Sequence, residues 1–238
     1  MLRHDRVDEA VRAEHFASQP AADRADLLDI GSLDGTAEYL AGIKAATPFR
    51  AEIVRTASDL GIADACKEAI REARGDYLVL LNNDTVVTEG WLQQLMSLAN
   101  ASPAVGMVGP MSNYAPVGQL VETVPYRVMP KKGGRFCVSE LADVNAVHAF
   151  AREFREKNKR KWIEIDRLSG FCLLLKRVVL DRIGAAKLDQ WTDLSLFDTD
   201  ILSVKARQVG FTLVANWLNA WVTPGSKVAK KSGVGTPL

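Results

Sequence analysis

The segment Asn82-Asn83-Asp84 carries side chains that could hold a divalent cation. It follows directly on the apolar run 77–81, so its carboxylate would stand at the tip of a buried strand. Mg²⁺ and Mn²⁺ take oxygen ligands, and an ion held here could also bind phosphate oxygens. The same residues also suit a plain turn, because Asn and Asp favour the backbone of turns. Taken alone, the segment leaves both interpretations open, with the turn as the simpler one.

Strand and helix patterns alternate along the chain around this segment. Apolar runs predict strands at 27–30, 51–56, 77–81, 105–108 and 171–175, and amphipathic spacing and turn signals predict helices at 36–45, 62–73, 91–100 and about 139–160. Such alternation is typical of parallel βαβ units, whose ligands bind at the carboxyl ends of the strands. Asp29 and Asp84 both lie at strand ends of this kind. We therefore expect an α/β fold with a mainly parallel twisted sheet flanked by helices, and 77–81 as a central strand.

The residues around this strand extend the motif. The stretch from Ala73 to Thr85, followed by Gly90-Trp91-Leu92, closely resembles the metal-binding segment of the family 2 inverting glycosyltransferases, and among them the rhamnosyltransferase-like branch. These enzymes have the GT-A fold of nucleotide-diphospho-sugar transferases. The resemblance implies that Asp84 contacts a Mn²⁺ or Mg²⁺ ion bridging the diphosphate of the donor, with Asn82 and Asn83 beside the nucleotide sugar.

Two further segments resemble parts of the donor site in that family. Residues 29–36 are similar to its D-N-G-S-x-D-G-T loop, which implies that Asp29 helps to hold the nucleotide base. Asp34 in the same loop suits the N-cap of the helix that follows. Residues 167–173 are similar to its G-F-C segment, where Gly170 would let the backbone lie close to the donor or acceptor sugar. Residues 106–110 and 112–114 resemble a stretch that we interpret as scaffold.

Residues Phe197-Asp198-Thr199-Asp200 resemble the E-D-x-D motif of the family. The resemblance implies that Asp198 is the general base, which removes the proton of the acceptor hydroxyl during inverting transfer. Asp200 would either contact the site residues without touching the substrate or cap the helix that follows.

The chain departs from the family pattern in three places. Residues 1–25 contain nothing like the usual first apolar strand, whose loop contacts the nucleotide. Thr223 stands where the late V-x-H-x-G-S segment has a histidine that can bind the metal. Asp59 and Lys67 stand where asparagines are usual. These departures concern metal affinity and turnover more than the fold.

The composition of the chain limits the kinds of molecule that we expect it to bind and the compartment in which we expect it. The 238 residues are 47% hydrophobic and 25% charged, with a formal net charge of +1, which gives no reason to expect a nucleic acid partner. The three cysteines, Cys66, Cys137 and Cys172, lack the spacing of a metal site, and we expect Cys66 and Cys172 in the core of a cytoplasmic protein. No apolar run reaches the ~18–20 residues of a membrane span, and no signal peptide opens the chain.

The sequence therefore predicts an N-terminal arm or helix (1–25), a single GT-A domain (26–226) and a C-terminal tail (227–238). Its expected activity is metal-dependent, inverting transfer of a sugar from a nucleotide-diphosphate donor to a saccharide or glycan, which could be membrane-associated. The alternative is a non-catalytic GT-A-like domain of a larger protein that binds a glycan or a protein. A nucleotidyltransferase is disfavoured because no Gly-rich, basic phosphate loop lies near the N-terminus.

Overall fold

The computed structural model of the chain describes the elements that would frame such a site. The described residues are 24–29, 35–46, 50–55, 70, 73–81, 85–113, 115, 118–121, 123–125, 130–131, 135–136, 144–159, 161–184 and 199–221. Within these ranges the strands form a five-stranded sheet and two two-stranded sheets.

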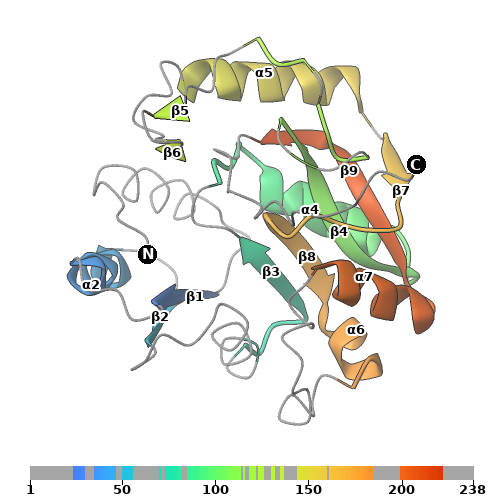
Figure 1. Ribbon diagram of the computed structural model, residues 1–238, viewed down its shortest axis with the longest axis horizontal. Coiled ribbons are helices and arrows are strands. Elements are labelled where there is room, and N and C mark those ends of the chain that lie inside the picture. Colours follow the sequence, from blue (N-terminus) through green and yellow to red (C-terminus); the bar gives the residue numbers. More distant parts are fainter. Residues whose placement is uncertain are drawn as a thin grey trace, which may run out of the picture.

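A parallel βαβ unit forms the N-terminal part of the described chain. Strand β1 (Arg24–Asp29) leads through helix α2 (Thr36–Ala46) to strand β2 (Arg50–Arg55), and β1 pairs with β2 in parallel, from Arg24 opposite Arg50 to Asp29 opposite Arg55. An ion pair of 2.8 Å between the Lys44 ammonium and the Glu52 carboxylate joins α2 to β2. This confirms the predicted parallel unit, drawn in blue in Figure 1.

The five-stranded sheet has the order β3-β8-β4-β9-β7. Its strands are β3 (Tyr77–Leu81), β8 (Cys172–Lys176), β4 (Val105–Ser112), β9 (Thr212–Trp221) and β7 (Trp162–Glu164). Strand β8 is antiparallel to both β3 and β4, β9 is parallel to β4, and β7 is antiparallel to β9. The α/β class is confirmed, and the sheet is mixed because β8 runs against its neighbours (Figure 1).

Strand β3 lies at one end of this described order rather than at its centre. Leu78 is buried in β3, and the other four residues of the strand are half-buried. The apolar run predicted a strand correctly, but the prediction of a central strand was wrong for the described sheet. A short apolar run reports that its side chains are covered, and it does not report which strands lie beside it or in which direction they run.

Helices cover both faces of the five-stranded sheet. Alternate residues of β8 point to opposite faces, so that Leu173 and Leu175 join one core cluster and Cys172 and Leu174 the other. Helices α6 (Arg177–Arg182) and α7 (Thr199–Gln208) pack on the first face, and α4 (Trp91–Asn100) packs on the second. Trp91, in the first turn of α4, is completely buried. The bounds predicted for α4 are confirmed.

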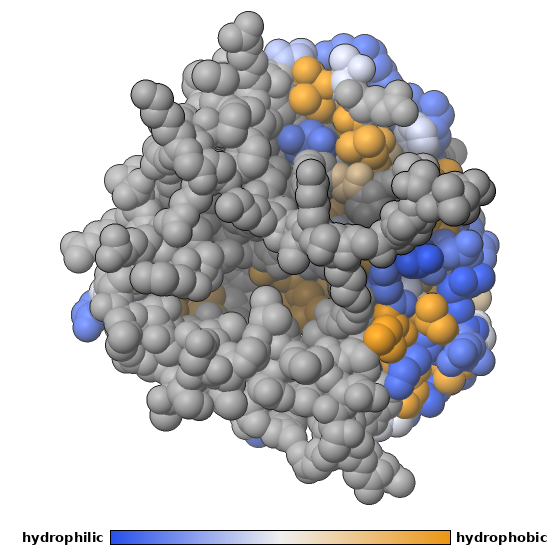
Figure 2. Space-filling model, viewed as in Figure 1, coloured by the Kyte–Doolittle hydropathy of each residue, from blue (hydrophilic) through white to orange (hydrophobic). Residues whose placement is uncertain are grey.

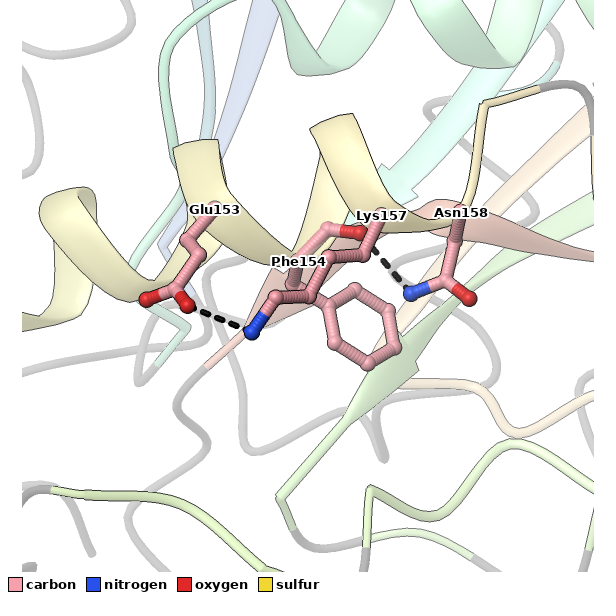
Figure 3. Close-up of polar contacts among 4 residues, drawn as sticks. All are labelled: Glu153, Phe154, Lys157 and Asn158. Carbon is pink, nitrogen blue, oxygen red and sulfur yellow. Dashed lines mark hydrogen bonds and ion pairs between the residues drawn. The ribbon is translucent and has the colours of Figure 1, made fainter.

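Helix α5 (Val144–Lys157) packs through its aromatic residues next to the far strands β7 and β9. The Phe154 ring stacks on the Trp217 ring of β9 with 6.5 Å between their centroids. At the end of the helix, the side-chain nitrogen of Asn158 donates to the Phe154 carbonyl oxygen at 2.8 Å (Figure 3). An ion pair of 2.5 Å between Lys157 and Glu153 supports the last turn. Helix α5 therefore ends at Lys157, before the predicted end at about 160, and residues 139–143 of the prediction lie outside the described residues.

On the face shown in Figure 2, hydrophobic residues of the described chain lie in small groups among hydrophilic ones on the right-hand side. A short hairpin of β5 (Pro130–Lys131) and β6 (Arg135–Phe136) lies outside the larger sheet. None of the described helices is long and apolar enough to cross a membrane.

Candidate functional site

The carboxyl ends of three strands meet at one edge of the five-stranded sheet. Strands β3, β4 and β9 run in the same direction, because β3 and β4 both oppose β8 and β9 is parallel to β4. Strand β8 begins at this edge, where Cys172 lies opposite Leu81, the last residue of β3. The register therefore brings the end of β3 next to the turn that precedes Cys172. In α/β sheets this is the edge at which ligands bind.

Of the predicted site residues, the structure describes Asp29 and Gly170. Asp29 is the last residue of β1, opposite Arg55 of β2. Gly170 lies in the half-buried turn two residues before β8. Asn82, Asn83, Asp84 and Asp198 lie outside the described residues, as does Thr223. For these residues the structure gives the flanking elements: β3 ends at Leu81, and α7 begins directly after Asp198.

Thr85 anchors the segment that carries the predicted metal ligand. Its side chain is 3% exposed, and its hydroxyl donates to the carbonyl oxygen of Phe171 at 3.4 Å. The two residues that flank 82–84 are thus both held at the start of β8, because Leu81 lies opposite Cys172 and Thr85 is bonded to Phe171, the residue before the strand. Two amides and a carboxylate in this interval are oxygen donors that suit Mn²⁺ or Mg²⁺.

Three neighbouring contacts hold the turn that contains Gly170. The Arg167 guanidinium forms an ion pair of 3.1 Å with the Asp200 carboxylate in the first turn of α7. The backbone N–H of Leu168 donates to the Ser203 hydroxyl at 3.2 Å, one turn further along α7. The backbone N–H of Ser169 donates to the side-chain oxygen of Gln119 at 2.7 Å. The start of α7 and the turn before β8 therefore form one connected unit.

Gln119 is a residue of this unit that sequence reasoning missed. Its carboxamide is buried and joins two elements, because its nitrogen donates to the Pro110 carbonyl oxygen at 2.8 Å while its oxygen accepts from Ser169. Its backbone carbonyl also accepts from the Ser112 N–H at 2.7 Å, which fixes it beside the end of β4. A single glutamine in a loop rich in proline and glycine carries no periodic signal that could have identified it.

Gly109 explains how the Gln119 side chain fits against β4. A β-carbon added at Gly109 would lie 2.6 Å from the Gln119 side-chain nitrogen and 2.7 Å from the Leu168 Cδ2 atom. At such distances an added β-carbon would force the Gln119 and Leu168 side chains to shift, so glycine permits the close approach seen here. The interpretation of residues 106–110 as scaffold agrees with this packing.

The titratable groups that the structure describes at this edge do not form a metal cluster. Cys172 is completely buried at the start of β8, and desolvation raises the pKa of its thiol far above the ordinary value. It is therefore a neutral core residue, as predicted, and not a nucleophile. Within the described ranges, no group of three or more His, Cys, Asp and Glu side chains is placed to hold a metal ion.

The chain matches the model of one protein family. The matching model is described as glycosyl transferase family 2, and it covers residues 27–184. This range includes Asp29, Asn82, Asn83, Asp84 and Gly170, and it ends before Asp198. No curated protein sequence matches the chain at a significant level.

Solved structures with the same fold include two sugar transferases. A mannosyltransferase from Pyrobaculum calidifontis, in complex with GDP-Man and Mn²⁺, is 16% identical with a TM-score of 0.62, over 96% of this chain and 56% of its own. GalNAc-T7 with UDP, GalNAc and Mn²⁺ is 13% identical with a TM-score of 0.56, over 90% and 40%. A mycobacterial protein is 14% identical with a TM-score of 0.53, over 96% and 66%. The chain thus spans about half the length of the two transferases, and the likeness shows a shared GT-A fold.

Proposed function

Because the chain belongs to glycosyl transferase family 2, we propose that it moves a sugar from a nucleotide-diphosphate donor to a saccharide or glycan acceptor. The observation that carries this proposal is the placement of the two residues that flank 82–84 at the sheet edge, Leu81 opposite Cys172 and Thr85 bonded to Phe171. Because both flanking residues are held at this edge, the oxygen donors of 82–84 would lie where ligands bind to such sheets, as a cation bound to phosphate oxygens requires.

The donor would bind through residues from two parts of the chain. Asp84 would hold Mn²⁺ or Mg²⁺, with Asn82 and Asn83 next to the diphosphate, while Asp29 at the end of β1 would contact the nucleotide base. A bound divalent cation would offset the negative charge on the departing diphosphate. Gly170 would let the backbone of its turn lie against the sugar. The similar transferases support this assignment, because both were solved with Mn²⁺ and a nucleotide or nucleotide sugar.

Asp198 would act as the general base on the acceptor side. Its carboxylate would take the proton from the acceptor hydroxyl while that oxygen attacks the anomeric carbon and the nucleoside diphosphate leaves on the opposite face. The configuration of the sugar would therefore be inverted. The position of Asp198 directly before α7 supports this role, because the first turn of that helix is joined to the Gly170 turn.

A thermal-shift panel tests the proposal. UDP, GDP, dTDP and their common sugars are each added with Mn²⁺ and with EDTA. A ligand at ~100 times its Kd should stabilise the fold by about 2.7 kcal/mol. We expect one nucleotide to raise the melting temperature with Mn²⁺, and EDTA or Asp84→Asn to abolish the shift.

The control is Asp181→Asn, which should respond like the wild type. Asp181 is exposed in α6, which follows the end of β8 that lies away from this edge. The absence of a shift with every nucleotide would contradict the proposal. It would instead favour a GT-A-like binding domain without transfer activity, which the threonine at position 223 also suggests.

A further inference from the structure

We propose that Arg167 and Asp200 form a positioning pair that orients the first turn of α7, and with it residue 198, relative to the metal-binding segment. This inference rests on the proposed function, because it assigns a role to the pair in sugar transfer. Arg167 and Asp200 act in it through their neighbours and do not themselves contact the substrate.

The pair lies at the exposed end of a row of contacts between α7 and the turn. Arg167 and Asp200 are 66% and 56% exposed, and their ion pair measures 3.1 Å. The next contact, from the Leu168 N–H to the Ser203 hydroxyl, is buried one helical turn away. Beyond it, Leu168 and Leu202 belong to the core cluster under the sheet. The inner part of α7 is therefore fixed by packing, while the ion pair holds the end that carries residue 198.

A chain of contacts leads from this helix end to residues 82–84. Asp200 binds Arg167, whose turn leads through Gly170 into Phe171 and Cys172. Phe171 accepts from Thr85, and Cys172 lies opposite Leu81, so both residues that flank 82–84 contact the short stretch that leads from the turn into β8. Gln119 fixes this stretch independently through the N–H of Ser169. Among the described contacts, the ion pair therefore joins the first turn of α7 to a turn that Gln119 also holds.

An exposed ion pair of this kind can orient the first turn of α7 while adding little to the free energy of folding. An exposed ion pair contributes about 0–1 kcal/mol to folding, because solvent screens the charges and two long side chains lose freedom. The first turn of a helix also has few internal hydrogen bonds, so a side-chain contact there governs its orientation more than the survival of the fold. Loss of the pair should leave the protein folded and impair the reaction.

The chain provides a matched control for this test. Arg207, near the end of α7, forms an ion pair of 2.8 Å with Asp166, the residue before Arg167. Both partners are also exposed, at 48% and 78%. This second pair therefore joins the same two segments at the end of α7 that is far from residue 198. Arg207→Ala should change neither turnover nor the exchange of the first turn.

The experiment compares Arg167→Ala, Asp200→Asn, the exchanged pair R167D/D200R and Arg207→Ala. Release of nucleoside diphosphate from GDP-mannose and UDP-sugars with Mn²⁺ gives kcat and KM, and melting temperatures report stability. A misplacement of a reacting group by about 1 Å can cost about 100-fold in rate. Loss of the Arg167–Asp200 pair leaves the Leu168–Ser203 hydrogen bond in place, so we expect a smaller loss, with kcat lowered about tenfold. The KM for the donor should stay within about twofold and the melting temperature within about 2 °C, and the exchanged pair should recover most of the rate.

Hydrogen–deuterium exchange provides a readout that does not depend on activity. In Arg167→Ala, the amides of residues 203 and 204, which in an α-helix donate to the carbonyl oxygens of residues 199 and 200, should exchange faster than in the wild type, while those of residues 206–208 stay unchanged. Unchanged exchange at residues 203 and 204 would overturn the inference whatever the activity. Normal kcat in both single variants would also overturn it. A wild type that releases no nucleoside diphosphate would contradict the proposed function instead, and exchange would still decide whether the pair orients the helix.

Discussion

The buried hydroxyl of Thr85 donates a hydrogen bond to the carbonyl oxygen of Phe171, with 3.4 Å between the two oxygens. Eighty-six positions separate these residues in the sequence. The bond joins the residue after the proposed metal ligand Asp84 to the residue after Gly170. One contact therefore fixes the proposed metal segment against the turn proposed to lie along the sugar.

Substitution of Thr85 should weaken the binding of a metal–nucleotide complex more than it weakens the fold. Thr85→Val keeps the shape of the side chain but removes the donor, which should cost about 1 kcal/mol of folding free energy and free one end of residues 82–84. Urea unfolding measures the first effect, and calorimetric titration of the stabilising nucleotide with Mn²⁺ measures the second. Thr85→Ser keeps the hydroxyl and should bind like the wild type. Equal affinity of Thr85→Val and the wild type would show that the bond does not support the site.

Asp198→Asn should separate transfer from donor binding. The amide keeps the size of the side chain but cannot accept the acceptor proton, so kcat should fall at least 100-fold, the lower end of what general base catalysis contributes. The melting shift with nucleotide and Mn²⁺ should remain. Transfer is measured as release of nucleoside diphosphate in the presence of a saccharide acceptor. Normal turnover by this variant would remove Asp198 from the role of base.

The sequence predicted those parts of the fold that depend on local pattern. The apolar run at 77–81 and the amphipathic helix at 91–100 have the predicted bounds in the structure. The direction of β8 was not predictable, because its pairing with β3 joins residues about 95 positions apart in the chain, from Leu81 opposite Cys172 to Tyr77 opposite Lys176. A periodic pattern says which side chains are covered and is silent on the partner strand.

The candidate site was predictable to a similar extent. Gly170 was selected because residues 167–173 resemble the G-F-C segment of the family; it lies in the turn before β8, and its contact with the sugar remains a prediction. Gln119 and Thr85 were missed, because their roles arise only when the fold brings Ser169 and Phe171 to them. Asn82, Asn83, Asp84 and Asp198 remain predictions from the family motifs.

Two glycine-to-alanine substitutions should change stability in opposite directions. A β-carbon at Gly109 would meet the Gln119 and Leu168 side chains at 2.6 and 2.7 Å, so Gly109→Ala should cost about 1–3 kcal/mol by overpacking. Gly42 lies exposed within α2 with no atom within 4 Å of an added β-carbon, so Gly42→Ala should stabilise the chain by up to about 1 kcal/mol. Urea unfolding measures both values. A neutral Gly109→Ala would show that Gln119 can move away without loss.

Cys172 should make the stability of the protein fall at alkaline pH. Burial raises the pKa of its thiol, so the folded state keeps the proton at pH values where the unfolded chain releases it, above about 8.5. The stabilising contribution is therefore complete below that pH and is lost as the pH rises, by up to about 1.4 kcal/mol per pH unit.

Urea unfolding at about pH 8 and about pH 10 should show a steeper loss for the wild type than for Cys172→Ala, which has no proton to release at this position. The comparison uses the slopes alone, because the alanine also removes packing atoms and lowers stability at every pH. Cys66 and Cys137 are the same in both proteins, so any effect of theirs cancels in the difference. Equal slopes would mean that the thiol reaches water in the native state, which would contradict its complete burial at the start of β8.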